Sequence, residues 1–190
     1  MNKAIFLDRD GVINELVYSS DRNEYEPPHR TEDLKLFDGV IDALKKFQEA
    51  GYKLFLISNQ PDHAKGKTTL EQLNLVHNEL DRIFKTNDIF FSEYYYCYHH
   101  PDGIVKEYSI DCECRKPKTY FVNKAVEEYE IDIDSSWLIG DRDKDIECGI
   151  NSGLKTVLIK SEININTIKS DFEATDLRQA SEIILSSNKN

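Results

Sequence analysis

The feature that most constrains the fold is a regular alternation of short apolar runs with amphipathic segments. The strand-forming runs occupy residues 3–7, 52–57, 89–97, 136–139 and 156–159. Apolar residues recur at helical spacing over residues 39–50, about 68–85, 120–129 and 146–151, and a final helix is expected at 177–185. Strands that alternate with helices predict an α/β fold, a doubly wound and mainly parallel sheet with helices on both faces. Such sheets bind their ligands at the carboxyl ends of the strands.

Two long polar segments interrupt the alternation, at about residues 15–36 and about residues 97–118. The remaining intervals hold single helices and strands, so no large cap domain fits between them. A chain of 190 residues suits one core, and we predict a single domain over residues 1–190. Because long loops inside compact domains are usually functional, we expect these two segments to select the substrate at an open site.

The charge of the chain excludes some partners. Its formal net charge is -11 at pH 7, and such a surface repels nucleic acid and anionic membranes. No apolar stretch approaches the ~18 residues of a membrane-spanning helix, and the first residues lack a basic region followed by a long apolar one. We therefore expect a cytoplasmic monomer, in which an anionic ligand would need a local cluster of Lys and Arg.

Acidic residues directly follow two of the predicted strands. Asp8 and Asp10 lie in FLDRDG, and Asp141 lies in IGDRDKD. Carboxylates held close together repel each other unless a cation lies between them or one is protonated. Since Mg2+ prefers oxygen ligands, Asp8, Asp141 and the carbonyl oxygen of Asp10 form a possible magnesium site. The spacing in DRDG alone is more typical of an acidic turn.

Two further polar residues lie where other strands or loops reach the same edge. Ser58 follows the run at 52–57 and offers a hydroxyl group, and Lys116 offers an ammonium group. A phosphoryl group under attack requires a metal, a hydroxyl, an ammonium and oriented amides around its oxygens. In such a site one aspartate can act as the nucleophile while a second transfers the proton.

Together, four motifs resemble those of the haloacid dehalogenase superfamily of phosphatases. The motifs are FLDRDGVIN, ISNQ, CRKP and IGDRDKD, in this order between residue 3 and about residue 160. The resemblance implies that Asp8 is the nucleophile, Asp10 the acid and base, Ser58 and Lys116 the phosphoryl-stabilising pair, and Asp141 a Mg2+ ligand. The presence of all five argues against the alternative of a catalytically inactive binding module.

The same motifs contain two further charged residues, Asp145 and Arg9. Asp145 matches an acid that supports the metal or the lysine in many relatives. Arg9 lies between the two aspartates, and the alternation of side chains along an extended segment predicts that it points away from the site.

The cysteines suggest a second metal. Cys97 and His99 are followed by Cys112 and Cys114, and three thiolates with one imidazole are the ligands of a closed tetrahedral zinc site. The alternative is that these cysteines are buried or disulfide-bonded. A bound zinc ion would fix the segment that leads directly into Lys116, so we expect zinc to be structural and Mg2+ to be catalytic.

The arrangement C-x-H, C-x-C before Arg115 is similar to that of the branch containing histidinol-phosphate phosphatases and D-glycero-D-manno-heptose 1,7-bisphosphate phosphatases. Among these relatives, histidinol-phosphate phosphatases tend to have a short interval between the two ligand pairs and the heptose enzymes a long one. The interval here is long, so the resemblance favours the heptose bisphosphate, with histidinol phosphate as the alternative. The resemblance implies loss of the C7 phosphate and retention of the C1 phosphate.

Four residues are candidates for binding this small phosphorylated sugar: Asn59, Gln60, Arg115 and Arg142. A guanidinium group binds phosphate oxygens in a bidentate manner, so Arg115 is expected to contact the retained phosphate. The sequence SNQPD departs from the small residue and glycine expected after SNQ, and the 15–36 segment is longer than its usual counterpart. The configuration of the sugar and its C1 anomer therefore stay open.

Overall fold

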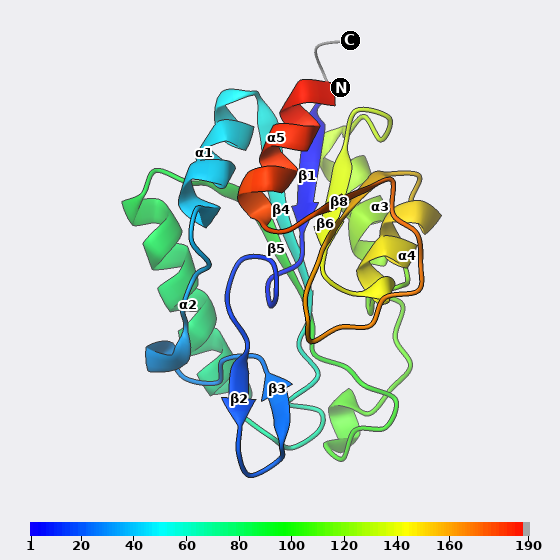
Figure 1. The fold of residues 1–190 in the computed structure, drawn as a ribbon. Coiled ribbons are helices and arrows are strands. Elements are labelled where there is room, and N and C mark those ends of the chain that lie inside the picture. Colours follow the sequence, from blue (N-terminus) through cyan, green and yellow to red (C-terminus); the bar gives the residue numbers. More distant parts are fainter. Residues whose placement is uncertain (188–190) are drawn as a thin grey trace.

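The computed structural model describes residues 1–187 and has a six-stranded sheet at its centre (Figure 1). The strand order is β5-β4-β1-β6-β7-β8, and every neighbouring pair is parallel. These strands are β1 (Lys3–Leu7), β4 (Tyr52–Asn59), β5 (Phe91–Cys97), β6 (Trp137–Gly140), β7 (Lys155–Ile159) and β8 (Phe172–Ala174). The chain builds outward from β1 in both directions, which confirms the predicted doubly wound fold and places its reversal point at β1.

Helices cover both faces of the sheet, as Figure 1 shows. They are α1 (Val40–Glu49), α2 (Leu70–Thr86), α3 (Tyr120–Tyr129), α4 (Asp143–Asn151) and α5 (Leu177–Ser187). Side chains alternate along β1: Ile5 and Leu7 pack with α1, α2 and α5, whereas Ala4 and Phe6 pack with α3 and α4. Burial on both faces explains why this strand is apolar throughout.

The segment at 15–36 contains regular structure that the sequence did not predict. It forms an antiparallel hairpin of β2 (Val17–Ser19) and β3 (Glu24–Glu26), followed by the short helix η1 (Thr31–Asp33). Strands of three residues are too short to show a period in the sequence. Figure 1 shows the hairpin beyond the carboxyl ends of the central strands, where a substrate would bind.

The structure differs from the predicted secondary structure in two other places. The short edge strand β8 was not predicted, and α4 begins at Asp143, three residues earlier than expected. The early start has a local cause, because the Asp145 carboxylate accepts a hydrogen bond from the backbone N–H of Arg142 (3.1 Å) and so caps the helix. Over residues 1–187, none of the helices has the length and hydropathy needed to cross a membrane.

Candidate active site

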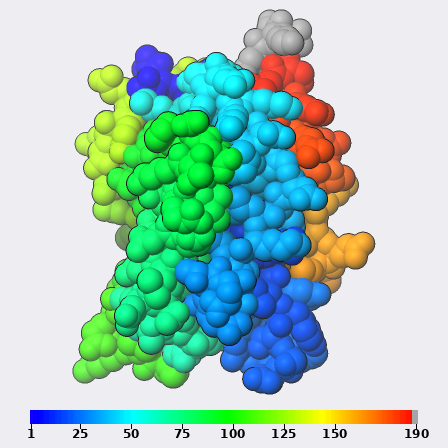
Figure 2. Space-filling view, turned by 90° about the vertical axis from the view of Figure 1, so that its left-hand side faces the viewer, coloured from blue at the N-terminus to red at the C-terminus, as the bar shows by residue number. Residues whose placement is uncertain are grey.

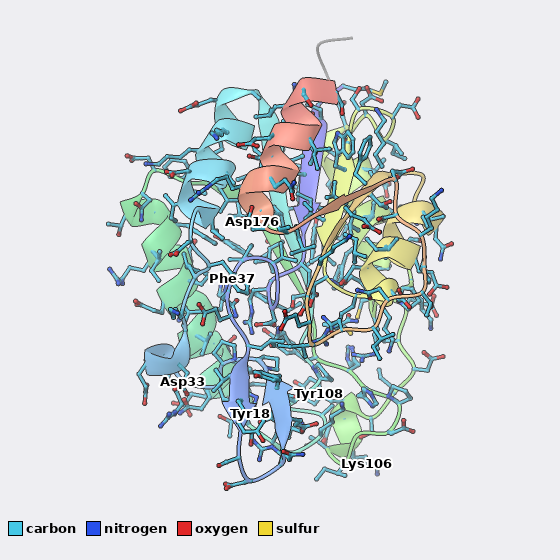
Figure 3. The ribbon with its side chains drawn as sticks, viewed as in Figure 1. Tyr18, Asp33, Phe37, Lys106, Tyr108 and Asp176 are labelled. Atoms are coloured by element: carbon cyan, nitrogen blue, oxygen red, sulfur yellow. The ribbon has the colours of Figure 1, made fainter. Side chains whose placement is uncertain are left out.

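A cleft of about 620 Å3 lies at the carboxyl ends of β1, β4 and β6. The hairpin, the loop after β4, the segment around Lys116 and the start of α4 all contribute to its lining. Figure 3 shows Tyr18 of the hairpin at the same end of the molecule as Lys106 and Tyr108 of the 97–118 segment, whereas Asp176 lies higher in that view. The two long polar segments therefore flank one site.

Lys116 joins two aspartates from different strand ends. Its Nζ lies 2.8 Å from Asp8 Oδ1 and 2.6 Å from Asp145 Oδ1, and it donates a third hydrogen bond to the carbonyl oxygen of Ile57 (2.7 Å). Burial alone would lower the pKa of Lys116, but the charges of Asp145 and Asp8 outweigh it and raise that pKa. The ammonium group is therefore fixed and charged beside Asp8.

The acids around this lysine form a pocket suited to a divalent cation. Oxygens of Asp8, Asp141 and Asp145 all lie within 4.8 Å of one another. Asp141 is fully buried and its Oδ1 has no hydrogen-bond partner among the described residues. Burial raises the pKa of Asp8 to about 6, although Lys116 opposes this, and burial with the charges of Asp145 and Asp8 raises the pKa of Asp141 to about 8. A cation bound to these oxygens would supply the missing positive charge, and the donor set fits Mg2+.

Gly11 is required for this arrangement. Its φ of +91° favours glycine, and a Cβ atom at this position would lie 2.2 Å from Asp141 Oδ2. The turn after β1 can therefore approach the second acidic strand end only without a side chain.

Asp10 is held by a dense set of hydrogen bonds. Its Oδ1 accepts from Arg9 Nη2 and from Asn14 Nδ2, both at 2.9 Å, and its Oδ2 accepts from Gln60 Nε2 at 2.5 Å. The prediction that Arg9 points away from the site was wrong, because this side chain is buried against Asp10 and also donates to Gln60 Oε1 (3.0 Å). The chain turns directly after β1, where the Arg9 carbonyl accepts from the N–H of Ile13, so strand alternation no longer applies.

The structure places the other predicted residues of ISNQ in positions that support their neighbours. Gln60 Nε2 also donates to Ser58 Oγ (2.9 Å), and both residues are buried. The Asn59 amide bonds the backbone N–H and carbonyl of Lys116, each at 3.1 Å. Since these amides already bind within the protein, the contacts of Asn59 and Gln60 with substrate stay predictions.

Two arginines predicted to bind substrate line the cleft. Arg115 donates to the carbonyl oxygen of His99 (3.2 Å), which ties it to the 97–118 segment. Arg142 precedes α4, and its Nε lies 3.8 Å from Asp141 Oδ2. Both positions suit contact with an anionic group of a ligand in the cleft.

The three cysteines and the histidine of the predicted zinc site meet at one point. Cys112 Sγ lies 3.4 Å from Cys97 Sγ and 3.3 Å from Cys114 Sγ, and His99 Nδ1 lies 3.5 Å from Cys114 Sγ. The cysteines are not disulfide-bonded. A tetrahedron built on Zn–S bonds of 2.3 Å has edges of about 3.8 Å, so these separations fit a zinc ion at the centre.

Sequence reasoning missed the loop that covers Asp141. Asn164 Nδ2 donates to Asp141 Oδ2 (2.6 Å), and Asn166 Nδ2 donates to the carbonyl oxygen of Asp141 (3.0 Å). The sequence ININ at residues 163–166 looks like any polar loop. The contacts with Asp141 could not be predicted from it, because they depend on how the chain folds back over the end of β6.

The fold and this site together define a phosphatase of the haloacid dehalogenase type. A family model described as HAD-hydrolase-like matches residues 113–181. The chain is 38% identical to the D-glycero-beta-D-manno-heptose-1,7-bisphosphate 7-phosphatase of Haemophilus influenzae, over 85% of this chain and 83% of the relative. It is 37% identical to the D-glycero-alpha-D-manno-heptose-1,7-bisphosphate 7-phosphatase of Photorhabdus laumondii, over 84% and 83% of the two chains.

Among solved structures, the D,D-heptose 1,7-bisphosphate phosphatase of B. bronchiseptica, complexed with magnesium and phosphate, aligns with a TM-score of 0.78. That alignment covers 97% of this chain and 99% of the other at 22% sequence identity, and it supports the fold alone. From the sequence relatives, the chain belongs to the family of heptose-bisphosphate 7-phosphatases within the haloacid dehalogenase superfamily, and it is a phosphoric monoester hydrolase.

Proposed function

We propose that this enzyme uses Mg2+ to remove the C7 phosphate from a D-glycero-D-manno-heptose 1,7-bisphosphate and leaves the C1 phosphate in place. The names of the relatives support this substrate, and so does the long interval between the two zinc-ligand pairs. A product of this kind would serve the synthesis of activated heptoses for a surface polysaccharide.

In the first step, the Asp8 carboxylate attacks phosphorus and the bond between phosphorus and the C7 oxygen breaks. Mg2+ would be held by Asp8 and Asp141, with either Asp145 or the carbonyl oxygen of Asp10 as a third ligand. When bound, the ion would neutralise charge on the phosphoryl oxygens. The fixed ammonium group of Lys116 and the hydroxyl group of Ser58 would contribute further to that stabilisation.

Asp10 would provide the proton for the leaving C7 oxygen. Oδ1 already accepts from both Arg9 and Asn14, whereas Oδ2 accepts from Gln60 alone, so the proton would be carried on Oδ2. In the second step Asp10 would take a proton from water, which attacks phosphorus and releases inorganic phosphate from Asp8. Gln60 and Arg9 therefore act as positioning residues in this proposal.

The observation that carries the assignment to a bisphosphate is a group of cations around the cleft. Lys65 and Lys144 line it together with Arg115, and among residues 1–187 neither lysine has a carboxylate within ion-pair distance. Burial lowers the pKa of Lys144, and the charges of Arg115 and Lys65 lower it further. Unpaired like charges gathered in one place favour binding of a second phosphate group.

The reaction needs no residue from a second chain, since every side chain assigned a role comes from one copy. We propose that the protein acts as a monomer in the cytoplasm, with residues 1–190 as one catalytic domain.

Substrate preference tests the proposal. The purified enzyme with Mg2+ should show a kcat/KM for the heptose 1,7-bisphosphate at least about tenfold above that for histidinol phosphate, because only the bisphosphate engages the unpaired cations. Phosphate release measured at several substrate concentrations gives both constants. Substituting Lys144→Ala should narrow this ratio by lowering the value for the bisphosphate. The reverse order of the wild-type constants would reject the heptose substrate.

A further inference from the structure

Asp62, which lines the cleft, and His29, which contacts it, have no role in the mechanism above. His29, which follows the hairpin, lies with Nε2 2.8 Å from Asp62 Oδ2 in the loop after β4. Asp62 is 4% exposed and lines the cleft. Its position is the one at which the sequence departs from the glycine expected after SNQ.

The loop after β4, which carries Asp62, also contacts the hairpin through Lys67. Lys67 Nζ lies 2.5 Å from Glu24 Oε1 and 2.6 Å from Glu26 Oε1. The backbone N–H of Lys67 also donates to the carbonyl oxygen of Asp62 (2.8 Å). Figure 2 shows the hairpin in blue at the lower end of the molecule. Asp62 is therefore held from both sides.

Only one oxygen of the Asp62 carboxylate is occupied. His29 binds Oδ2, and over residues 1–187 nothing donates a hydrogen bond to Oδ1. The Asp62 side chain is 6% exposed, and Oδ1 keeps some contact with water, so a hydrogen-bond donor on a ligand can replace that water. A ligand hydroxyl supplies such a donor, whereas a phosphate oxygen would be repelled.

We propose that Asp62, held by His29, is a specificity-determining residue that accepts a hydrogen bond from a hydroxyl group on the carbon chain beside the reacting phosphate. The proposal rests on the proposed function and adds the recognition of the polyol part of the substrate. It also gives the extended 15–36 segment a role, because that segment supplies the histidine that orients the acceptor. Asp62 thereby favours phosphates of polyols over phosphates of alcohols that lack hydroxyl groups.

The test compares a heptose 7-phosphate without a C1 phosphate with p-nitrophenyl phosphate, which has no hydroxyl groups. Asp62→Ala should lower kcat/KM for the heptose 7-phosphate about 10- to 100-fold, the effect of losing a hydrogen bond to a charged group. The value for p-nitrophenyl phosphate should change less than about twofold. The ratio of these two kcat/KM values, heptose 7-phosphate over p-nitrophenyl phosphate, should therefore fall in Asp62→Ala. His29→Ala should lower the same ratio by a smaller factor. Asp42→Ala is the matched control, because Asp42 is exposed on α1 and does not line the cleft, so this substitution should leave both values unchanged.

Equal losses of kcat/KM on both substrates would show that Asp62 only maintains the structure. Unchanged kcat/KM values on both would remove Asp62 from recognition, and either result overturns the proposal. A loss confined to histidinol phosphate would assign Asp62 to an ammonium group and overturn it as well. If Asp62→Ala does not fold, Asp62→Asn preserves the side-chain shape and should still lower the ratio. Because the ratio compares variants on substrates without a C1 phosphate, it is independent of whether the wild-type enzyme prefers the bisphosphate.

Discussion

Substituting Asp8→Asn is expected to lower kcat by a factor on the order of 10^4 or more, the range typical of removing a catalytic nucleophile. The carboxamide keeps the shape of the side chain but cannot form the acyl phosphate. Release of phosphate measured under saturating substrate and Mg2+ gives the comparison. Asp42→Asn, an exposed substitution on α1, is the control and should retain wild-type activity.

The same substitution should not weaken the fold in the absence of metal. The pKa of Asp8 is raised to about 6, above the ordinary 3.8. The stability associated with its neutral form is therefore complete below pH 3.8 and is lost as the pH rises through about 6. Asparagine stays neutral, so at pH 7 without Mg2+ the variant should melt at or above the wild-type temperature.

Phosphatase activity of Asp8→Asn close to that of the wild type would reject the covalent mechanism.

Removing zinc is expected to have the second largest effect. Cys112→Ser should reduce bound zinc from one equivalent to less than about a tenth and lower kcat/KM about 100-fold. The reason is structural, because Cys114 directly precedes Arg115 and Lys116, and the metal fixes their backbone. Elemental analysis of protein purified without chelators gives the stoichiometry, and limited proteolysis should detect opening of the 97–118 segment.

Cys148→Ala provides the control for the zinc prediction. Cys148 is buried on α4 against the core and is not part of the cysteine cluster. This variant should keep one equivalent of zinc and most of its activity. Wild-type protein that is fully active with less than about a tenth of an equivalent would eliminate the zinc site.

The strand ends could be predicted because their chemistry is local in sequence. Asp8 and Asp141 directly follow apolar runs, and parallel strands bring such ends to one edge whatever the details of the loops. The zinc ligands were predictable for a similar reason, since two close pairs of ligands leave few other arrangements.

Contacts made between distant loops could not be predicted in this way. His29 meets Asp62 across 33 positions, and Asn164 reaches Asp141 across 23. Neither pair leaves a period or spacing in the sequence. Arg9 was misplaced for a different reason, because the strand rule was applied beyond Leu7, where the strand has already ended.

In the proposed reaction, Asp8 and its neighbours act on one phosphate of a bisphosphate and spare the other. Phosphorus NMR of the heptose 1,7-bisphosphate during turnover tests it most directly. The C7 phosphate resonance should disappear as inorganic phosphate grows in equal amount, while the C1 phosphate resonance persists. Loss of the C1 resonance first, or of both at equal rates, would contradict the proposed orientation of the substrate in the cleft.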